Sequence, residues 1–311
     1  MQLCSMKKAL IIFFGCLCFS VHSQTFNQLT NRADSLTKSS KFRESNSIYL
    51  SLIKANPDYD YLDIIYQRIG RNYVDLVEMD SALISFNRSI NSNPKSSNSL
   101  YYRGHVYIHF KEFQKALDDF KNSFAIKPNI HTVYNIGLCF NKLELYDSSI
   151  HYALKTLEFS DSDLPAYYLL LQNFMDSNQW DKAIEVCDDL IKLEPYSGYL
   201  NRAKIFGTNL NQFSKAQKDL AKCITLMPSR GDAYWYSGKF FIENTDYSEA
   251  VEMFDKLIEL EPENPYAYEQ RATAWFNVGI LNYVCRDLDK AIQYLHSDSN
   301  AILEWKNQVC K

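Results

Sequence analysis

The chain has 311 residues, of which 46% are hydrophobic and 14% aromatic, enough to form a buried core. Nine Gly and eight Pro are too few for a collagen-like or loop-rich chain, and the formal net charge of −4 excludes the basic character typical of nucleic-acid binding. Composition therefore indicates a folded protein without a nucleic-acid partner.

The first segment of the chain, residues 1–23, has the outline of a secretory signal peptide. Lys7 and Lys8 precede an apolar run that ends near Phe19, and the run is shorter than the ~18 residues that a membrane-spanning helix needs. We therefore expect export and cleavage after Ser23, with no transmembrane segment in the mature chain.

Two alternatives stay open in this segment. Met6 can replace Met1 as the true start, because a lysine-led beginning fits the charged region of a signal peptide better. Lipid attachment at Cys16 is a minority alternative, since Gly15 precedes that cysteine but Phe13 occupies a position usually held by Leu. The destination is predicted to be the periplasm, the cell envelope or the medium.

Prolines recur at a nearly constant interval through the rest of the chain. Successive separations are 37, 34, 67, 33 and 34 residues, where 67 is close to two periods, for Pro57, Pro94, Pro128, Pro195, Pro228 and Pro262. Between prolines, apolar residues follow at steps of three and four, as in Phe113, Ala116, Phe120 and Phe124. This pattern predicts a repeated pair of amphipathic helices, each pair ended by a proline.

The repeating unit resembles the tetratricopeptide repeat, which has a small residue in its first helix, an aromatic near the turn, an alanine in its second helix and a final proline. Small residues stand at Gly70, Gly104, Gly137 and Gly238, and the alanine place holds Ala82, Ala116, Ala183, Ala216 and Ala250. The sixth unit departs from the pattern, because Lys204 falls in its small place.

This resemblance implies an all-α fold, a right-handed α-solenoid of about eight helix-turn-helix hairpins followed by a C-terminal capping helix. The array is expected to cover residues 24–298 and the cap residues 299–311. The predicted units lie near 26–59, 63–96, 97–129, 130–163, 164–196, 197–230, 231–264 and 265–298.

Two cysteines are predicted to form a disulfide. Cys285 and Cys310 are equally distant from a turn expected near residue 297, so two antiparallel helices joined there would bring them level, and export favours oxidation. The stretch "CRDLDKA" followed by a late cysteine also resembles the ending of exported repeat proteins of the Bacteroidetes type. Other cysteines of the mature chain lie on or near apolar helix faces and are expected to be core residues.

No catalytic motif is present in the sequence, which lacks H-E-x-x-H, zinc-type C-x-x-C pairs, a phosphate loop and G-x-S-x-G. His105 and His109 are one helical turn apart but have no third ligand nearby in sequence. We therefore expect a protein that is not an enzyme and that has no cofactor, catalytic residue or metal site.

The resemblance implies that first helices line a concave groove. It places Tyr101, His105, Tyr134, Tyr168, Gln172, Arg202, Trp235, Lys239 and Glu269 there. Aromatic anchors beside polar groups suit an extended peptide or an apolar helix. The alternative for each ring is simple packing against the next repeat.

The main functional interpretation is a non-enzymatic scaffold or adaptor that binds another protein, of unknown identity, in this groove. A second interpretation is an accessory component of an envelope enzyme or secretion assembly, whose groove binds glycan or nascent envelope protein. A third is a purely structural connector.

Overall fold

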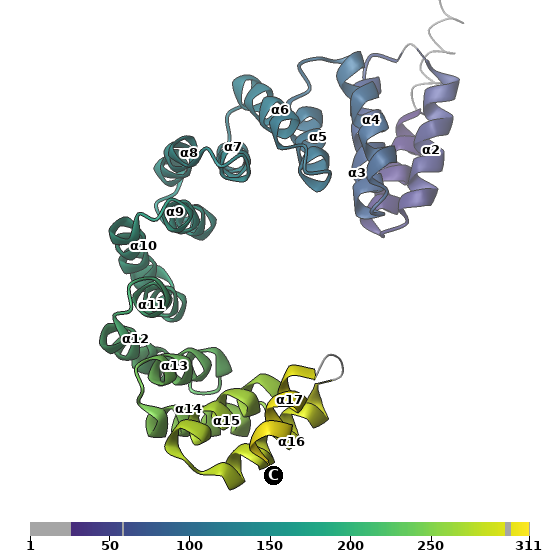
Figure 1. Ribbon diagram of the computed structural model, residues 1–311. Coiled ribbons are helices and arrows are strands. Elements are labelled where there is room, and N and C mark those ends of the chain that lie inside the picture. Colours follow the sequence, from purple (N-terminus) through teal and green to yellow (C-terminus); the bar gives the residue numbers. More distant parts are fainter. Residues whose placement is uncertain (1–25, 58, 296–299, 311) are drawn as a thin grey trace, which may run out of the picture. The chain divides into compact units, whose positions relative to one another are not determined.

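Figure 1 shows a computed structural model of the chain, which describes residues 26–57, 59–295 and 300–310. Within these ranges the regular structure is helical, with no strand. The predicted signal peptide and its cleavage site lie outside the described residues. After a helical stretch at 26–38, the helices are α2 (Phe42–Ala55), α3 (Leu62–Asp75), α4 (Met79–Ser92), α5 (Ser97–His109), α6 (Phe113–Ile126), α7 (Ile130–Lys142), α8 (Tyr146–Phe159), α9 (Leu164–Asp176), α10 (Trp180–Leu193), α11 (Pro195–Lys204), η1 (Ile205–Asn209), α12 (Phe213–Leu226), α13 (Gly231–Glu243), α14 (Tyr247–Leu260), α15 (Pro265–Val278), α16 (Leu281–Tyr294) and α17 (Asn300–Val309).

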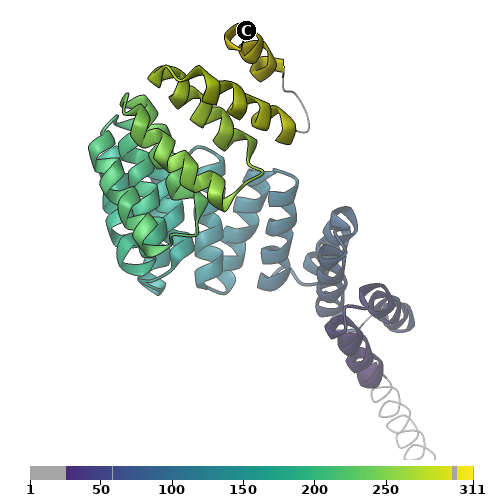
Figure 2. The same cartoon turned by 90° about the horizontal axis from the view of Figure 1, so that it is seen from below.

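The helices fall into two compact units, one up to Asp161 and one from Ser162 onward. In the first unit the stretch 26–38 precedes α2, and α3–α4, α5–α6 and α7–α8 are hairpins; in the second, α9–α10, α11–α12, α13–α14 and α15–α16 are hairpins and α17 follows. Both views show the two helices of a hairpin lying side by side (Figures 1 and 2). The predicted all-α class is confirmed.

Each second helix buries one face with the same spacing. In α6 the buried residues include Ala116 and Phe120, and in α14 they include Ala250, Phe254 and Leu257. Steps of four and three residues keep these side chains on one side of an α-helix. The alanine place of the repeat is fully buried because a larger side chain would separate the two helices of the hairpin.

Small residues in the first helices let aromatic rings lie against the backbone. A Cβ atom added to Gly104 would stand 2.8 Å from the Phe120 ring, and one added to Gly238 would stand 2.6 Å from the Phe254 ring. Both distances are below van der Waals contact, so any larger residue would push the hairpin apart. These glycines are required by packing within the hairpin.

The turn inside each hairpin has a left-handed residue. Their φ angles lie between +52° and +88°, at Ser40, Val77, Lys111, Glu144, Asn178, Asn211, Thr245 and Gly279. In the second hairpin, the Glu78 amide then donates to the Tyr73 carbonyl at 2.8 Å and closes the end of α3. A non-glycine residue in this conformation costs roughly 1–2 kcal/mol, so the main-chain bonds of the turn outweigh that strain.

The sixth repeat differs from the prediction. Its first helix begins at Pro195 rather than at residue 197, and it ends in the π-helical turn η1, which adds one residue to the helix. Fully buried Ala203 therefore occupies the small place and shares a core cluster with Leu220. The assignment of Lys204 to that place was wrong. The Nζ atom of Lys204 instead lies 4.6 Å from the ring centroid of Tyr236.

Candidate functional site

The residues predicted to bind a partner come from first helices in both compact units. Tyr101 and His105 lie on α5, Tyr134 on α7, Tyr168 and Gln172 on α9, Arg202 on α11, Trp235 and Lys239 on α13, and Glu269 on α15. Gln172 is exposed and the others are half-buried. We call the side of each unit formed by these positions its first-helix face.

A cluster of neutral groups joins α5 to α7 in the first unit. The Tyr101 and His105 rings meet edge to face with centroids 4.7 Å apart, and the side-chain nitrogen of Asn135 is 3.2 Å from His105 Nε2. The same nitrogen donates to the Tyr101 hydroxyl at 3.4 Å. Burial lowers the pKa of His105 and raises the pKa of Tyr101, so both stay uncharged near neutral pH.

His105 should make stability depend on pH. Because its pKa is lower in the folded state, the unfolded chain binds the proton more readily, and the stabilisation present above the unfolded pKa of ~6.5 is lost as the pH falls toward the folded value. We expect urea denaturation of His105→Gln to lose this fall in unfolding free energy below pH 7. The exposed His109→Gln variant is the control and should keep the wild-type slope; an unchanged slope in His105→Gln would contradict the assignment.

Tyr168 is tied to the end of the next helix. Its hydroxyl donates to Glu194, the residue that follows α10, at 2.6 Å, and burial raises the pKa of Tyr168. Gln172, one turn later on α9, donates to Asp176 at 2.6 Å. The Tyr168 hydroxyl is thus fixed within the hairpin, which leaves its half-buried ring as the part available to a partner.

A second aromatic position in this unit is Trp235. Its ring stands at 75° to that of Phe254 with centroids 6.0 Å apart, so the neighbouring helix supports it. One turn later, Lys239 Nζ lies 3.9 Å from Glu243. Burial raises the pKa of the half-buried Glu269 on α15. The first-helix face of this unit therefore combines an aromatic ring with charges of both signs.

Arg202 belongs to a different kind of site. Its guanidinium makes two hydrogen bonds to Asp219 on α12, at 2.8 and 2.7 Å, and a third to Asp188 on α10. The same arrangement recurs where Arg103 pairs with Asp119 and Asn87, and where Arg271 pairs with Asp287 and Asp255; we call these three sets arginine clamps. Arg202 thus joins three helices of neighbouring hairpins.

The cysteines divide as the sequence suggests. Cys285 and Cys310 are joined by a disulfide, with Cα atoms 5.7 Å apart, and the bond links the start of α16 to the residue after α17. Cys139, Cys187 and Cys223 are buried free cysteines. Burial raises the pKa of each thiol to about 12. These three thiols are therefore protonated core residues.

The described ranges contain no candidate membrane-spanning helix and no candidate metal-binding cluster. None of the helices there is long and apolar enough to cross a membrane. Nor do three or more His, Cys, Asp or Glu side chains of those ranges come together as a group that could hold a metal ion.

Comparison with known proteins connects this fold to one family. Residues 232–264 match the model of the tetratricopeptide repeat. Two solved structures resemble the chain over most of its length: a tetratricopeptide repeat protein from Parabacteroides merdae (TM-score 0.58, 18% identity, 81% of this chain and 99% of that one) and the C-terminal part of a TPR repeat-containing protein from Cytophaga hutchinsonii (TM-score 0.66, 20% identity, 78% and 98%). The chain thus has the α-solenoid fold of tetratricopeptide repeat proteins, as predicted. Residues 232–264 form one such repeat.

Curated relatives match over a smaller part of their own length. The human mitochondrial import receptor subunit TOM70 is 23% identical over 216 residues, which cover 68% of this chain and 31% of that protein. The Dictyostelium discoideum homolog of DnaJ homolog subfamily C member 7 is 24% identical over 243 residues, covering 78% of this chain and 40% of the relative. The chain therefore spans about a third to two fifths of the length of these relatives.

Proposed function

We propose that this protein is a non-enzymatic scaffold that binds a peptide or helix of a partner protein on its first-helix faces. The observation that carries this proposal is an aromatic side chain at one repeated position. Tyr101, Tyr134 and Trp235 each come three residues before the small glycine of their repeat, and Tyr168 holds the same place before Leu171. All four rings are half-buried, so each has support from its hairpin and a surface left for contact.

Aromatic rings held in this way suit protein recognition. They supply a large contact area, and packing has already restricted their rotamers, so less conformational entropy is lost on binding. The charges of both signs near Trp235 would then select among partners, because an unpaired charge buried in a contact is unfavourable. The import receptor subunit among the relatives is consistent with a role in binding other proteins.

The test is quantitative binding to an identified partner. A partner captured from the native envelope fraction would be purified, and its dissociation constant measured by calorimetry for wild type and for Trp235→Ala, Tyr168→Ala and Tyr134→Ala. We expect at least one of these variants to weaken binding tenfold or more, the effect of an aromatic anchor worth ~1.4 kcal/mol or more. The control is Phe159→Ala, an exposed aromatic at the end of a second helix; equal affinities throughout would overturn the proposal.

We further propose that the protein is exported. The lysine-led apolar segment before Ser23 supports this, and so does the disulfide between Cys285 and Cys310, since such bonds persist mainly in oxidising compartments.

A further inference from the structure

The second helix of the sixth hairpin, α12, carries a row of positive charges. Its three lysines are exposed and follow one another at steps of three and four residues, so they lie along one face: Lys215, Lys218 and Lys222. The acid of this helix, Asp219, is buried and paired with Arg202. Within the described ranges none of the three lysines forms an ion pair. We call them the lysine row.

The second helices on either side have the opposite charge. Figure 1 shows α12 between α10 and α14 in the second unit. Four acids and two lysines give α10 a net charge of −2, and four acids and one lysine give α14 a net charge of −3, whereas α12 has a net charge of +2. On these flanking helices Lys192 pairs with Asp189 and Lys256 pairs with Glu259. The lysine row is therefore a positive strip between two negative ones.

A cavity lies at the start of the lysine row. It has a volume of about 880 Å³ and lies between the sixth and seventh hairpins, where the turn after η1 and the first turn of α12 approach the end of α13. Lys215 and Lys218 line it, together with the half-buried rings of Phe213 and Phe241. The cavity therefore places two cations beside an aromatic wall.

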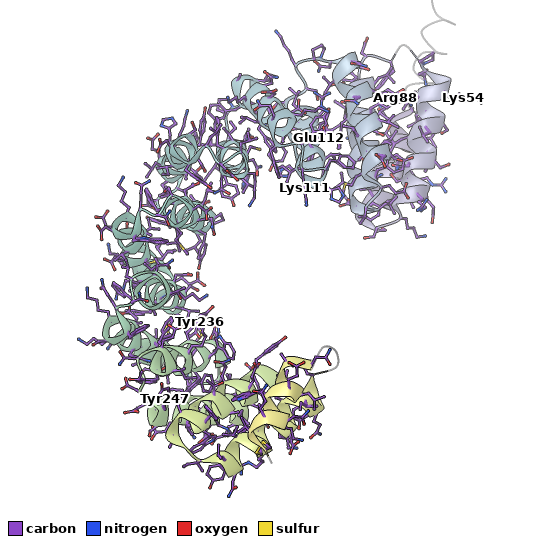
Figure 3. The ribbon with its side chains drawn as sticks, in the orientation of Figure 1. Lys54, Arg88, Lys111, Glu112, Tyr236 and Tyr247 are labelled. Atoms are coloured by element: carbon purple, nitrogen blue, oxygen red, sulfur yellow. A yellow bond between two sulfur atoms is a disulfide. The ribbon has the colours of Figure 1, made fainter. Side chains whose placement is uncertain are left out.

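The other groups of the cavity leave it positive. Asp246, the carboxylate among the lining residues, comes just before Tyr247 (labelled in Figure 3) and already accepts a hydrogen bond from Asn244 at 2.6 Å. Gln212, the N-cap of α12, makes no side-chain hydrogen bond to the first turn, so the positive end of the helix dipole adds to the charge of the lysines. The cavity and the row together favour an anion.

The geometry of the row favours a short anion over a long one. Seven residues of helix separate Lys215 from Lys222, which corresponds to roughly 10 Å, and an extended chain covers that distance in about three residues. A long polyanion such as nucleic acid, or an anionic membrane surface, would also meet the acids of α10 and α14 and be repelled by them.

We propose that the lysine row binds a short acidic segment of a partner protein. Three or four carboxylates of the segment lie along Lys215, Lys218 and Lys222, and an apolar residue at one end of the segment enters the cavity beside Phe213 and Phe241. The lysines supply the attraction, and the aromatic wall at one end of the row fixes the direction of the segment. This site is separate from the first-helix faces and does not depend on the function proposed above.

The probes are two short peptides, LDDED and DEDDL, each labelled with fluorescein at the end away from leucine. Fluorescence anisotropy on the full chain should show saturable binding of one of them, and binding should weaken as salt is added because salt screens the charges. The matched peptide with glycine in place of leucine should bind about fivefold or more weakly, since it leaves the aromatic wall uncovered.

Charge reversals test the lysine row. Lys218→Glu and Lys222→Glu should each weaken the acidic peptide about fivefold or more, because each replaces an attraction with a repulsion. The variant with all three lysines replaced by glutamate should bind the peptide LKKKK instead, a reversal that loss of folding cannot produce. Lys121→Glu, at an exposed lysine of α6, makes the same change in net charge and should leave binding unchanged, as should Trp235→Ala.

Several results would overturn the proposal. Among them are no saturable binding of either acidic leucine peptide, unchanged affinity in the Lys218→Glu and Lys222→Glu variants, and equal affinity of the leucine and glycine peptides. Equally tight binding of a thymidine oligonucleotide or of vesicles with anionic lipid would assign the row to a different class of partner. Self-association in sedimentation that the triple variant abolishes would assign it to the acidic helices of a second copy.

Discussion

We expect Arg271→Met to lower the free energy of unfolding by roughly 3–5 kcal/mol, the loss typical when one member of a buried ion pair is removed. Asp287 is completely buried and both of its oxygens accept from Arg271, at 2.8 and 2.7 Å. Methionine keeps most of the side-chain volume but removes both hydrogen bonds, which leaves the carboxylate only the more distant Arg286, whose Nε lies 3.7 Å from Oδ1. Urea denaturation followed by circular dichroism measures the change.

Two controls isolate the ion pair. The double variant Arg271→Met, Asp287→Leu should recover most of the loss, because two apolar groups replace the pair together. Lys256→Met removes the exposed partner of Glu259 on α14 and should leave the denaturation midpoint where it is in wild type. A loss below about 1 kcal/mol for Arg271→Met would show that the clamp is dispensable.

Removal of the disulfide should lower the free energy of unfolding by about 3 kcal/mol in the chain-entropy account, since it closes a loop with a sequence separation of 25 residues. The variant Cys285→Ser, Cys310→Ser should show the loss in urea denaturation. Reductant should destabilise wild type by a similar amount and leave the double variant unaffected. The last comparison separates this bond from the three buried thiols.

Intact mass gives an independent check of the bond. Alkylation of the denatured chain without reductant should modify Cys139, Cys187 and Cys223 and leave Cys285 and Cys310 unmodified. Alkylation of all five in that condition would contradict the disulfide.

The helical repeat could be predicted because it depends on local patterns. Prolines at a fixed interval and apolar residues at steps of three and four determine where helices end and which face is buried, and the small residue opposite Phe120 or Phe254 is visible as glycine. The pairing of Cys285 with Cys310 followed from the same reasoning, because two antiparallel helices bring residues equally distant from their turn together.

Other features depend on contacts between hairpins that spacing alone does not reveal. From the sequence alone, Arg202 cannot be distinguished from a free surface charge. The structure shows that it pairs with both Asp188 and Asp219. A signal was nevertheless present: Arg103 and Asp119 are 16 residues apart, as are Arg271 and Asp287. The separation of 17 for Arg202 and Asp219 records the extra residue of η1.

The site residues show the same limit. Sequence reasoning found Tyr101 and His105 on one helix but missed Asn135, which joins them from the next hairpin. An asparagine in a helix has no periodic signal, and only the approach of α5 and α7 shows that its amide is needed.

The left-handed turn of the hairpins has a consequence for how such a chain can diversify. The turn is closed by main-chain hydrogen bonds, and the residue in the left-handed conformation is exposed whether it is serine, valine, lysine, glutamate, asparagine or threonine. The fold of the turn therefore does not depend on which side chain this residue carries. The exposed turn residue of each hairpin can therefore be replaced, in evolution or by engineering, while the two helices stay the same. Single substitutions at these turns can thus give a hairpin a new binding specificity.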